Sequence, residues 1–78
     1  MYDFFSGKVE KITPTDVVIN CGGIGYLLNI SLNTFEALKS KTECKVFAHL
    51  IVREDSHTLY GFATESERSL YIKLIGVH

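Results

Sequence analysis

The sequence is short of most features that mark a specialised class of protein. It has no tryptophan, one proline and two cysteines among 78 residues. It holds no run of about 18 apolar residues, so we expect no membrane span. Its start lacks the charged-then-apolar layout of a signal peptide. These absences predict one soluble cytoplasmic domain, and the 46% hydrophobic content is sufficient for a compact core.

Potential metal ligands are few and dispersed. Cys21 and Cys44 do not form a C-x-x-C pair, and His49, His57 and His78 are scattered along the chain. This spacing does not supply a zinc-like ligand set, so we expect no metal site. We interpret the cysteines as buried free thiols, with a disulfide as the alternative, and the histidines as structural residues.

The chain has no surplus of positive charge. Eight Lys and Arg residues stand against nine Asp and Glu residues, which gives a net charge of −1. Affinity for nucleic acid comes largely from basic side chains that neutralise phosphates. The composition therefore argues against a strong nucleic-acid binder acting alone, although a local basic patch stays possible.

Alternating apolar positions predict five β-strands. Phe5, Gly7 and Val9 share one face of the first strand, and Gly7 indicates a bulge or bend. Turns are predicted at 13–16, around the single proline, and at the glycine-rich stretch 22–25. The other predicted strands are 17–21, 26–30, 45–53 and 57–62. The near-continuous apolar run of 45–53 predicts burial on both faces for part of that strand.

A change of period predicts a short helix over 33–39. Asn33 and Glu36 have the spacing of a capping box. Leu32, Phe35 and Leu38 recur at three-residue spacing and would form its apolar face.

A second helix is predicted over 64–75. Thr64 and Glu67 form another capping-box pattern. The apolar stripe predicted for this helix consists of Leu70, Tyr71, Leu74 and Ile75. Because little chain follows to cover this stripe, we expect the sequence to be part of a longer protein.

Three strands, a helix and two strands is the element order of an OB-fold, a five-stranded Greek-key barrel that often binds oligonucleotides. We therefore predict an all-β barrel with short helices over residues 1–63, followed by a C-terminal helix in 64–78. Element order alone does not indicate a function, because small barrels serve many.

The stretch "VREDSHTLYGF", residues 52–62, places Glu54 and Asp55 side by side where one predicted strand turns into the next. Acidic residues suit solvent-exposed turns, so a simple solvated turn is one interpretation. A general acid–base pair or a Mg²⁺ site is another. It is poorly supported, because neighbouring turn residues usually point apart and no third carboxylate lies near in sequence.

Three stretches together resemble a known family: "GGIGYLLNISLNTFEAL", "VREDSHTLYGF" and "ESERSLYIKLI". Their order and spacing are similar to the N-terminal domain of the RuvA family, the Holliday-junction-binding subunits of the bacterial RuvAB branch-migration complex. The resemblance covers essentially the whole chain.

This resemblance implies an OB-fold domain through which subunits form a tetramer, in a protein of homologous recombination and DNA repair. Glu54 and Asp55 match the family's acidic pin, which projects towards the centre of the open four-way junction. Arg53, Tyr60 and Gly61 are expected to support that hairpin. The resemblance implies no catalytic, cofactor-binding or metal-binding residue.

The resemblance also implies partners beyond these residues. A second domain would grip Holliday-junction phosphates through helix-hairpin-helix motifs, and "LIGVH" resembles the approach to the first of them. A third domain would contact the RuvB motor, and ATP would be used by that motor alone.

Two other functions stay open. A generic single-strand-binding OB domain would stack bases on exposed aromatic residues such as Tyr60 or Phe62. A pure oligomerisation module would need no contact with nucleic acid. The glycines of 22–25 predict a β-turn and not a dinucleotide-binding loop, because neither a helix nor a downstream acidic residue follows at the required spacing.

Overall fold

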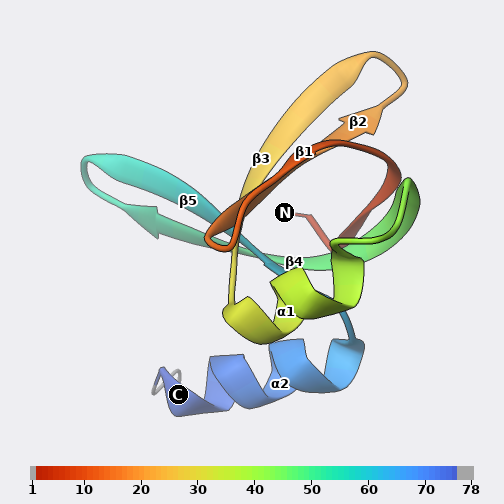
Figure 1. The fold of residues 1–78 in the computed structure, drawn as a ribbon. Coiled ribbons are helices and arrows are strands. Elements are labelled where there is room, and N and C mark those ends of the chain that lie inside the picture. The colour runs from red at the N-terminus through yellow and green to blue at the C-terminus, as the bar shows by residue number, and fades with distance from the viewer. Residues whose placement is uncertain (1, 76–78) are drawn as a thin grey trace.

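The computed structural model describes residues 2–75, which form five strands and two helices. Figure 1 shows how these elements are arranged. His78 and the end of the predicted segment 64–78 lie outside the described residues. The elements are β1 (Phe4–Ile12), β2 (Asp16–Cys21), β3 (Ile24–Ile30), α1 (Leu32–Leu38), β4 (Glu43–Arg53), β5 (Ser56–Phe62) and α2 (Glu65–Leu74).

The five strands close into a barrel in the order β1-β2-β3-β5-β4. Every neighbouring pair is antiparallel except β3 and β5, which run parallel. The side chains that alternate inwards make the core, among them Val17, Ile19, Leu28 and Val46, each with 0% exposure. The predicted OB-fold barrel with a following helix is therefore confirmed.

Strand β1 bends and pairs with two neighbours. Its first half pairs with β4 and its second half with β2, and Lys8 takes part in both pairings. Of the bulge or bend predicted at Gly7, the bulge lies further along the strand, because the register shifts between Val9 and Lys11. Gly7 is needed for another reason: a Cβ at this position would overlap the backbone carbonyl oxygen of Asn20.

The N-cap of helix α1 lies two residues before the predicted cap. Ser31, not Asn33, is the N-cap, and its hydroxyl oxygen accepts a hydrogen bond from the Thr34 backbone N–H at 3.2 Å. This register buries Thr34 and Leu38, whereas Leu32 is 62% exposed. Of the predicted apolar face, Leu38 reaches the core and Leu32 does not.

Helix α2 begins as predicted, but a different face packs against the barrel. Thr64 is the N-cap, and its hydroxyl accepts from the Glu67 N–H at 3.2 Å. Leu70 and Leu74, which the sequence placed in an apolar stripe, are 58% and 74% exposed. Tyr71 is the member of that stripe that packs on the barrel. Neither helix within residues 2–75 is long and apolar enough to cross a bilayer.

Both predicted turns and the free state of the thiols are confirmed. The Thr13 hydroxyl accepts from the backbone N–H groups of Thr15 and Asp16 and closes the 13–16 turn.

Cys21 and Cys44 are free and half-buried against the core, so they are less buried than predicted. Burial raises the pKa of the Cys44 thiol, and the nearby Lys41 charge opposes this rise.

Strand β4 is buried mainly on one side. Val46 and Ala48 face the core, whereas Phe47 and the three residues after Ala48 are half-buried. The outer side of this strand is shielded in part because α2 packs across β4 and β5. The predicted burial on both faces is therefore partial, and it holds around residues 47–51.

Candidate functional site

The β4–β5 hairpin leaves the barrel as a two-stranded ribbon. Strand β4 pairs with β1 only as far as Phe47, and β5 pairs with β3 only at Tyr60 and Gly61. Residues 50–53 and 56–59 therefore pair only with each other, in four cross-strand pairs. At a strand rise of about 3.3 Å per residue, the ribbon extends about 13 Å beyond the barrel. Figure 1 shows it pointing away from the other strands, on the left.

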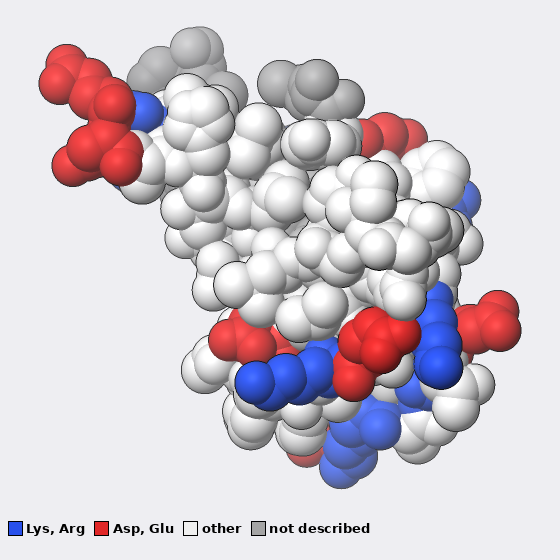
Figure 2. Space-filling model, turned by 90° about the horizontal axis from the view of Figure 1, so that it is seen from above, with Lys and Arg blue, Asp and Glu red and all other residues white. Residues whose placement is uncertain are grey.

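Glu54 and Asp55 form the two-residue turn at the end of this ribbon. The last cross-strand pair joins Arg53 to Ser56, so the two acidic residues alone make the connection. Both are exposed. Within residues 2–75, no hydrogen bond or ion pair joins either carboxylate to another side chain, and no group of three metal-ligand residues forms. Figure 2 shows an acidic cluster at the end of a projection from the body.

The backbone at this turn places no special demand on the residue type. Among the described residues, only Gly22 and Gly23 have a positive φ. The Glu54–Asp55 turn is therefore neither type I′ nor type II′, the hairpin turns that require glycine-like conformations. Many residues could occupy these two positions, so the adjacent carboxylates are not explained by the turn geometry.

The three predicted support residues lie at the two ends of the ribbon. Arg53 is the last paired residue before the tip and is exposed. Tyr60 lies at the foot of the ribbon, paired across the strands with His49. Gly61 is buried beside it, and a Cβ there would lie 2.7 Å from Cγ1 of Val46. Their positions are consistent with a support role, which stays a prediction.

The aromatic residues required by the single-strand alternative are not available as a stacking surface. Phe62 is only 8% exposed. Tyr60 is half-buried, and its ring lies 5.5 Å from the ring of Tyr71. Base stacking needs an open aromatic face. The more exposed aromatic surface is at Phe4, on the outside of β1, with Lys45 Nζ 4.2 Å from its ring centroid.

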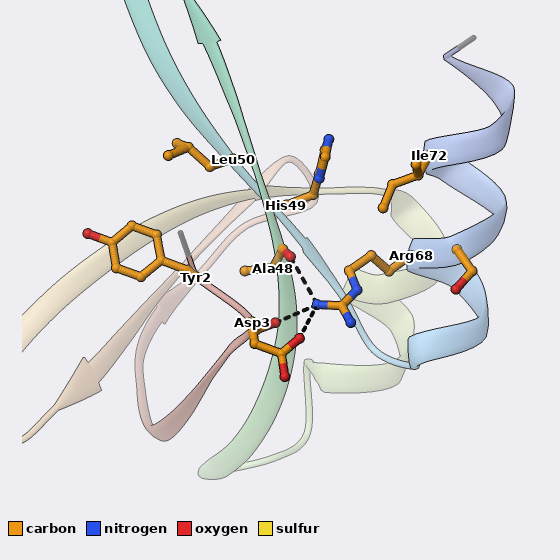
Figure 3. Close-up of a pocket in the computed structure, with 8 residues that line it drawn as sticks. Tyr2, Asp3, Ala48, His49, Leu50, Arg68 and Ile72 are labelled. Atoms are coloured by element: carbon orange, nitrogen blue, oxygen red, sulfur yellow. Dashed lines mark hydrogen bonds and ion pairs between the residues drawn. The ribbon is translucent and has the colours of Figure 1, made fainter. Parts of the chain in front are cut away.

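A groove of about 350 Å³ lies between β4 and α2 (Figure 3). Its cationic residue is Arg68, whose Nη1 donates to the Asp3 carbonyl oxygen at 2.7 Å and to the Asp3 carboxylate at 2.8 Å. The same nitrogen donates to the Ala48 carbonyl oxygen at 3.2 Å. Through these bonds from Nη1, Arg68 holds α2 on the barrel.

Comparison with known proteins agrees with this architecture. A family model described as the RuvA N terminal domain matches residues 1–61. The chain belongs to this family. The predicted resemblance is thereby confirmed, and the OB-fold barrel is the RuvA N-terminal domain.

Relatives match along almost the entire chain. The "Holliday junction branch migration complex subunit RuvA" of Parabacteroides distasonis is 46% identical over 77 residues, 99% of this chain and 39% of that protein. The subunits of the same name from Flavobacterium psychrophilum and Lactococcus lactis are 48% and 43% identical, again over 99% of this chain. They are covered to 40% and 39% of their own length. The chain therefore spans roughly two fifths of these RuvA proteins.

The sequence patterns did not identify two residues as part of the site. Tyr71 appeared only as part of an apolar stripe and Arg68 only as part of a family motif, yet both join α2 to the barrel beside the ribbon. Their positions on α2, three residues apart, put them on one helix face. That spacing was visible in the sequence, but nothing local indicated that this face would meet β4.

Proposed function

We propose that this chain is the barrel and acidic-pin domain of a subunit that binds Holliday junctions in homologous recombination and DNA repair. The observation that carries the proposal is the placement of two unpaired carboxylates at the end of a projecting ribbon, in a turn whose backbone does not require them. The name of the relatives, Holliday junction branch migration complex subunit, supports the same activity.

The pin acts through repulsion. A carboxylate about 4 Å from a phosphate is disfavoured by roughly 1 kcal/mol in water and by about 4 kcal/mol at an intermediate dielectric. The paired strands hold this charge at a defined distance from the barrel. At the centre of a four-way junction, Glu54 and Asp55 therefore keep the DNA arms apart and separate strands that exchange partners. The pin sets the position of the DNA and does not add affinity.

Affinity for the junction comes from elsewhere in the full-length protein. The net charge of −1 in this chain is unsuited to tight phosphate binding. A second domain, reached through the segment 64–78, grips the junction phosphates, and four copies of the barrel assemble into a tetramer. A third domain contacts the RuvB motor, which hydrolyses ATP. In this proposal the chain is a non-catalytic, cytoplasmic subunit without a cofactor of its own.

The test is to neutralise the pin in the full-length protein with Glu54→Gln and Asp55→Asn, which remove charge and nearly preserve shape. We expect affinity for a four-way junction to hold or rise, because an unfavourable charge is gone, while the preference for junction over linear duplex falls. Glu54→Lys with Asp55→Lys should tighten duplex binding further. It should also steepen the salt dependence by about 0.9 in log–log slope for each additional phosphate that the new lysines neutralise.

A matched control removes the same charge from the body of the barrel. Glu36 and Glu43 are exposed, and their change to Gln should leave the junction preference unaltered. Junction and duplex affinities measured across a salt series compare the variants. An unchanged preference in both pin variants would falsify the proposal, and abolished branch migration with normal DNA binding would indicate a catalytic or metal site instead.

A further inference from the structure

One side chain of α2 contacts both strands of the ribbon at its foot. The Tyr71 ring lies 5.5 Å from the ring of Tyr60 and 5.2 Å from that of Phe62, both on β5. It also meets the ring of His49 on β4 edge-on at 6.3 Å. These separations fall in the range of favourable aromatic pairs. Since His49 and Tyr60 are paired across the strands, Tyr71 packs where the ribbon leaves the barrel.

The helix that carries Tyr71 is itself anchored. Three residues earlier, the Arg68 guanidinium donates to the Asp3 and Ala48 carbonyl oxygens and to the Asp3 carboxylate, as Figure 3 shows. The Arg68 side chain is only 15% exposed, and bonds that involve a charged donor are stronger than neutral ones. Ala48 immediately precedes His49 on β4, so the anchor lies directly beside the aromatic contact.

The pKa of the Tyr71 hydroxyl reflects its surroundings on the barrel and the ribbon. Burial raises the pKa of Tyr71, the neighbouring Tyr60 adds to this rise, and the positive charge of Arg53 opposes it. Arg53 immediately precedes the acidic tip.

The ribbon needs such a contact. A two-stranded hairpin alone is marginally stable in water, and packing against a helix is one way to stabilise it. Beyond Phe47 and Tyr60 the ribbon has no further strand as a neighbour within residues 2–75. A tilt of about 10° at its foot would move a tip about 13 Å away by about 2 Å. The angle at the foot therefore controls where the two carboxylates lie.

We infer that Tyr71 is a positioning residue for the acidic pin: held by the Arg68 anchor of α2, its ring sets the angle at which the β4–β5 ribbon leaves the barrel. The consequence for DNA rests on the proposed function of the pin. The bracing of the ribbon does not, so the two can be tested apart.

The test measures amide hydrogen exchange in three forms of the full-length protein: the wild type, Tyr71→Ala and Tyr71→Phe. We expect Tyr71→Ala to speed exchange in residues 50–59 by about tenfold, on the scale of losing several aromatic contacts. Exchange in the β2–β3 hairpin should be unaltered. Tyr71→Phe keeps the ring and should restore the normal rates. Leu74→Ala is the matched control, because Leu74 is on the same helix but 74% exposed.

The same variants are then compared on junction and linear duplex. We expect Tyr71→Ala to lose junction preference and Tyr71→Phe to keep it. Unaltered exchange in residues 50–59 of Tyr71→Ala overturns the inference, whatever the pin variants show. Equal acceleration of exchange in both hairpins also overturns the inference. If Tyr71→Ala does not fold, Tyr71→Leu, which keeps an apolar contact but loses the aromatic ring, is measured in its place and judged by the same two outcomes. Suppose that Tyr71→Ala speeds exchange only in residues 50–59, but neutralising Glu54 and Asp55 does not lower the preference for junction over duplex. The positioning role of Tyr71 is then retained, and the proposed function of the pin is refuted.

Discussion

Two β-hairpins with two-residue turns project from the same barrel, and their tips are built differently. The β2–β3 hairpin turns through Gly22 and Gly23, with φ of 63° and 98°. Figure 1 shows it pointing to the upper right, whereas the β4–β5 ribbon points to the left. The β4–β5 hairpin turns through Glu54 and Asp55 without any positive φ. The first tip is explained by backbone geometry, and the second is not.

The polar groups of the two tips differ in the same way. At the glycine tip, the Gly23 N–H donates to the Asn20 side-chain oxygen at 2.8 Å, and the Asn20 amide donates to Glu10 at 2.9 Å. This network stays within the hairpin and its neighbour β1. At the acidic tip, no such bond to Glu54 or Asp55 exists within residues 2–75. The polar groups of the glycine tip are used in hydrogen bonds within the protein, which is typical of a structural turn. The carboxylates of the acidic tip face solvent and stay available to a partner molecule.

Exchanging the two tips gives the largest expected effect. Gly22→Glu with Gly23→Asp forces side chains into left-handed conformations, which costs about 1–2 kcal/mol for each residue. The reverse change, Glu54→Gly with Asp55→Gly, adds only unfolded-chain entropy, about 1 kcal/mol in total. Urea denaturation should show the first variant to be clearly less stable than the second. Equal losses would mean that the acidic turn is as demanding as the glycine turn.

A second, smaller effect separates two of the strand-interior glycines, one from each hairpin. Gly61, at the foot of the ribbon, would place a Cβ 2.7 Å from Val46 and 3.2 Å from Leu28, both fully buried. Overpacking of a core costs about 1–3 kcal/mol, so Gly61→Ala should lower the free energy of unfolding by that amount. Gly25, near the other tip, is exposed and meets only Val18, at 3.2 Å. Gly25→Ala is the control and should lose less; a larger loss there would contradict the comparison.

Much of the fold could be predicted because its signals are local. Alternation of apolar residues marked the strands, and the glycines of 22–25 marked a turn that needs positive φ. Thr64 was correctly identified as a cap. Ser31 and Asn33 are both good cap residues, and residue type alone does not choose between them.

The site was predictable at its tip and not at its foot. Adjacent acids at a strand reversal are visible in the sequence. The length of the ribbon beyond the barrel depends on where β4 stops pairing with β1 and where β5 stops pairing with β3. These pairings join strands that are distant in the sequence, so no local pattern predicts them. The predicted stripe of α2 included Tyr71, which packs on the barrel, but also Leu70 and Leu74, which are exposed. Arg68, outside the stripe, also faces the barrel. An apolar stripe shows which helix face avoids water but not which surface is available to cover it.

The smallest expected effect is a pH dependence confined to the foot of the β4–β5 ribbon. Burial raises the pKa of Tyr71 above the ordinary tyrosine value of about 10. In the unfolded chain Tyr71 loses its proton first as the pH rises, so the folded state binds more protons in this range and its stability falls. The contribution is fully present below pH about 10 and is lost as the pH rises through the folded-state pKa.

Tyrosinate absorbance, compared between the wild type and Tyr71→Phe, measures this titration directly. The titration that Tyr71→Phe lacks should occur at higher pH in the folded protein than in denaturant. After correction for the base-catalysed rise of intrinsic exchange with pH, the protection of residues 50–59 should fall over the same interval, because a phenolate is poorly suited to the aromatic cluster. The β2–β3 hairpin lacks the contact with Tyr71, so its corrected protection should change less. The predicted difference between the two hairpins would be wrong if the protection of both fell equally with pH. It would also be wrong if Tyr71 titrated at the same pH in the folded and the denatured protein.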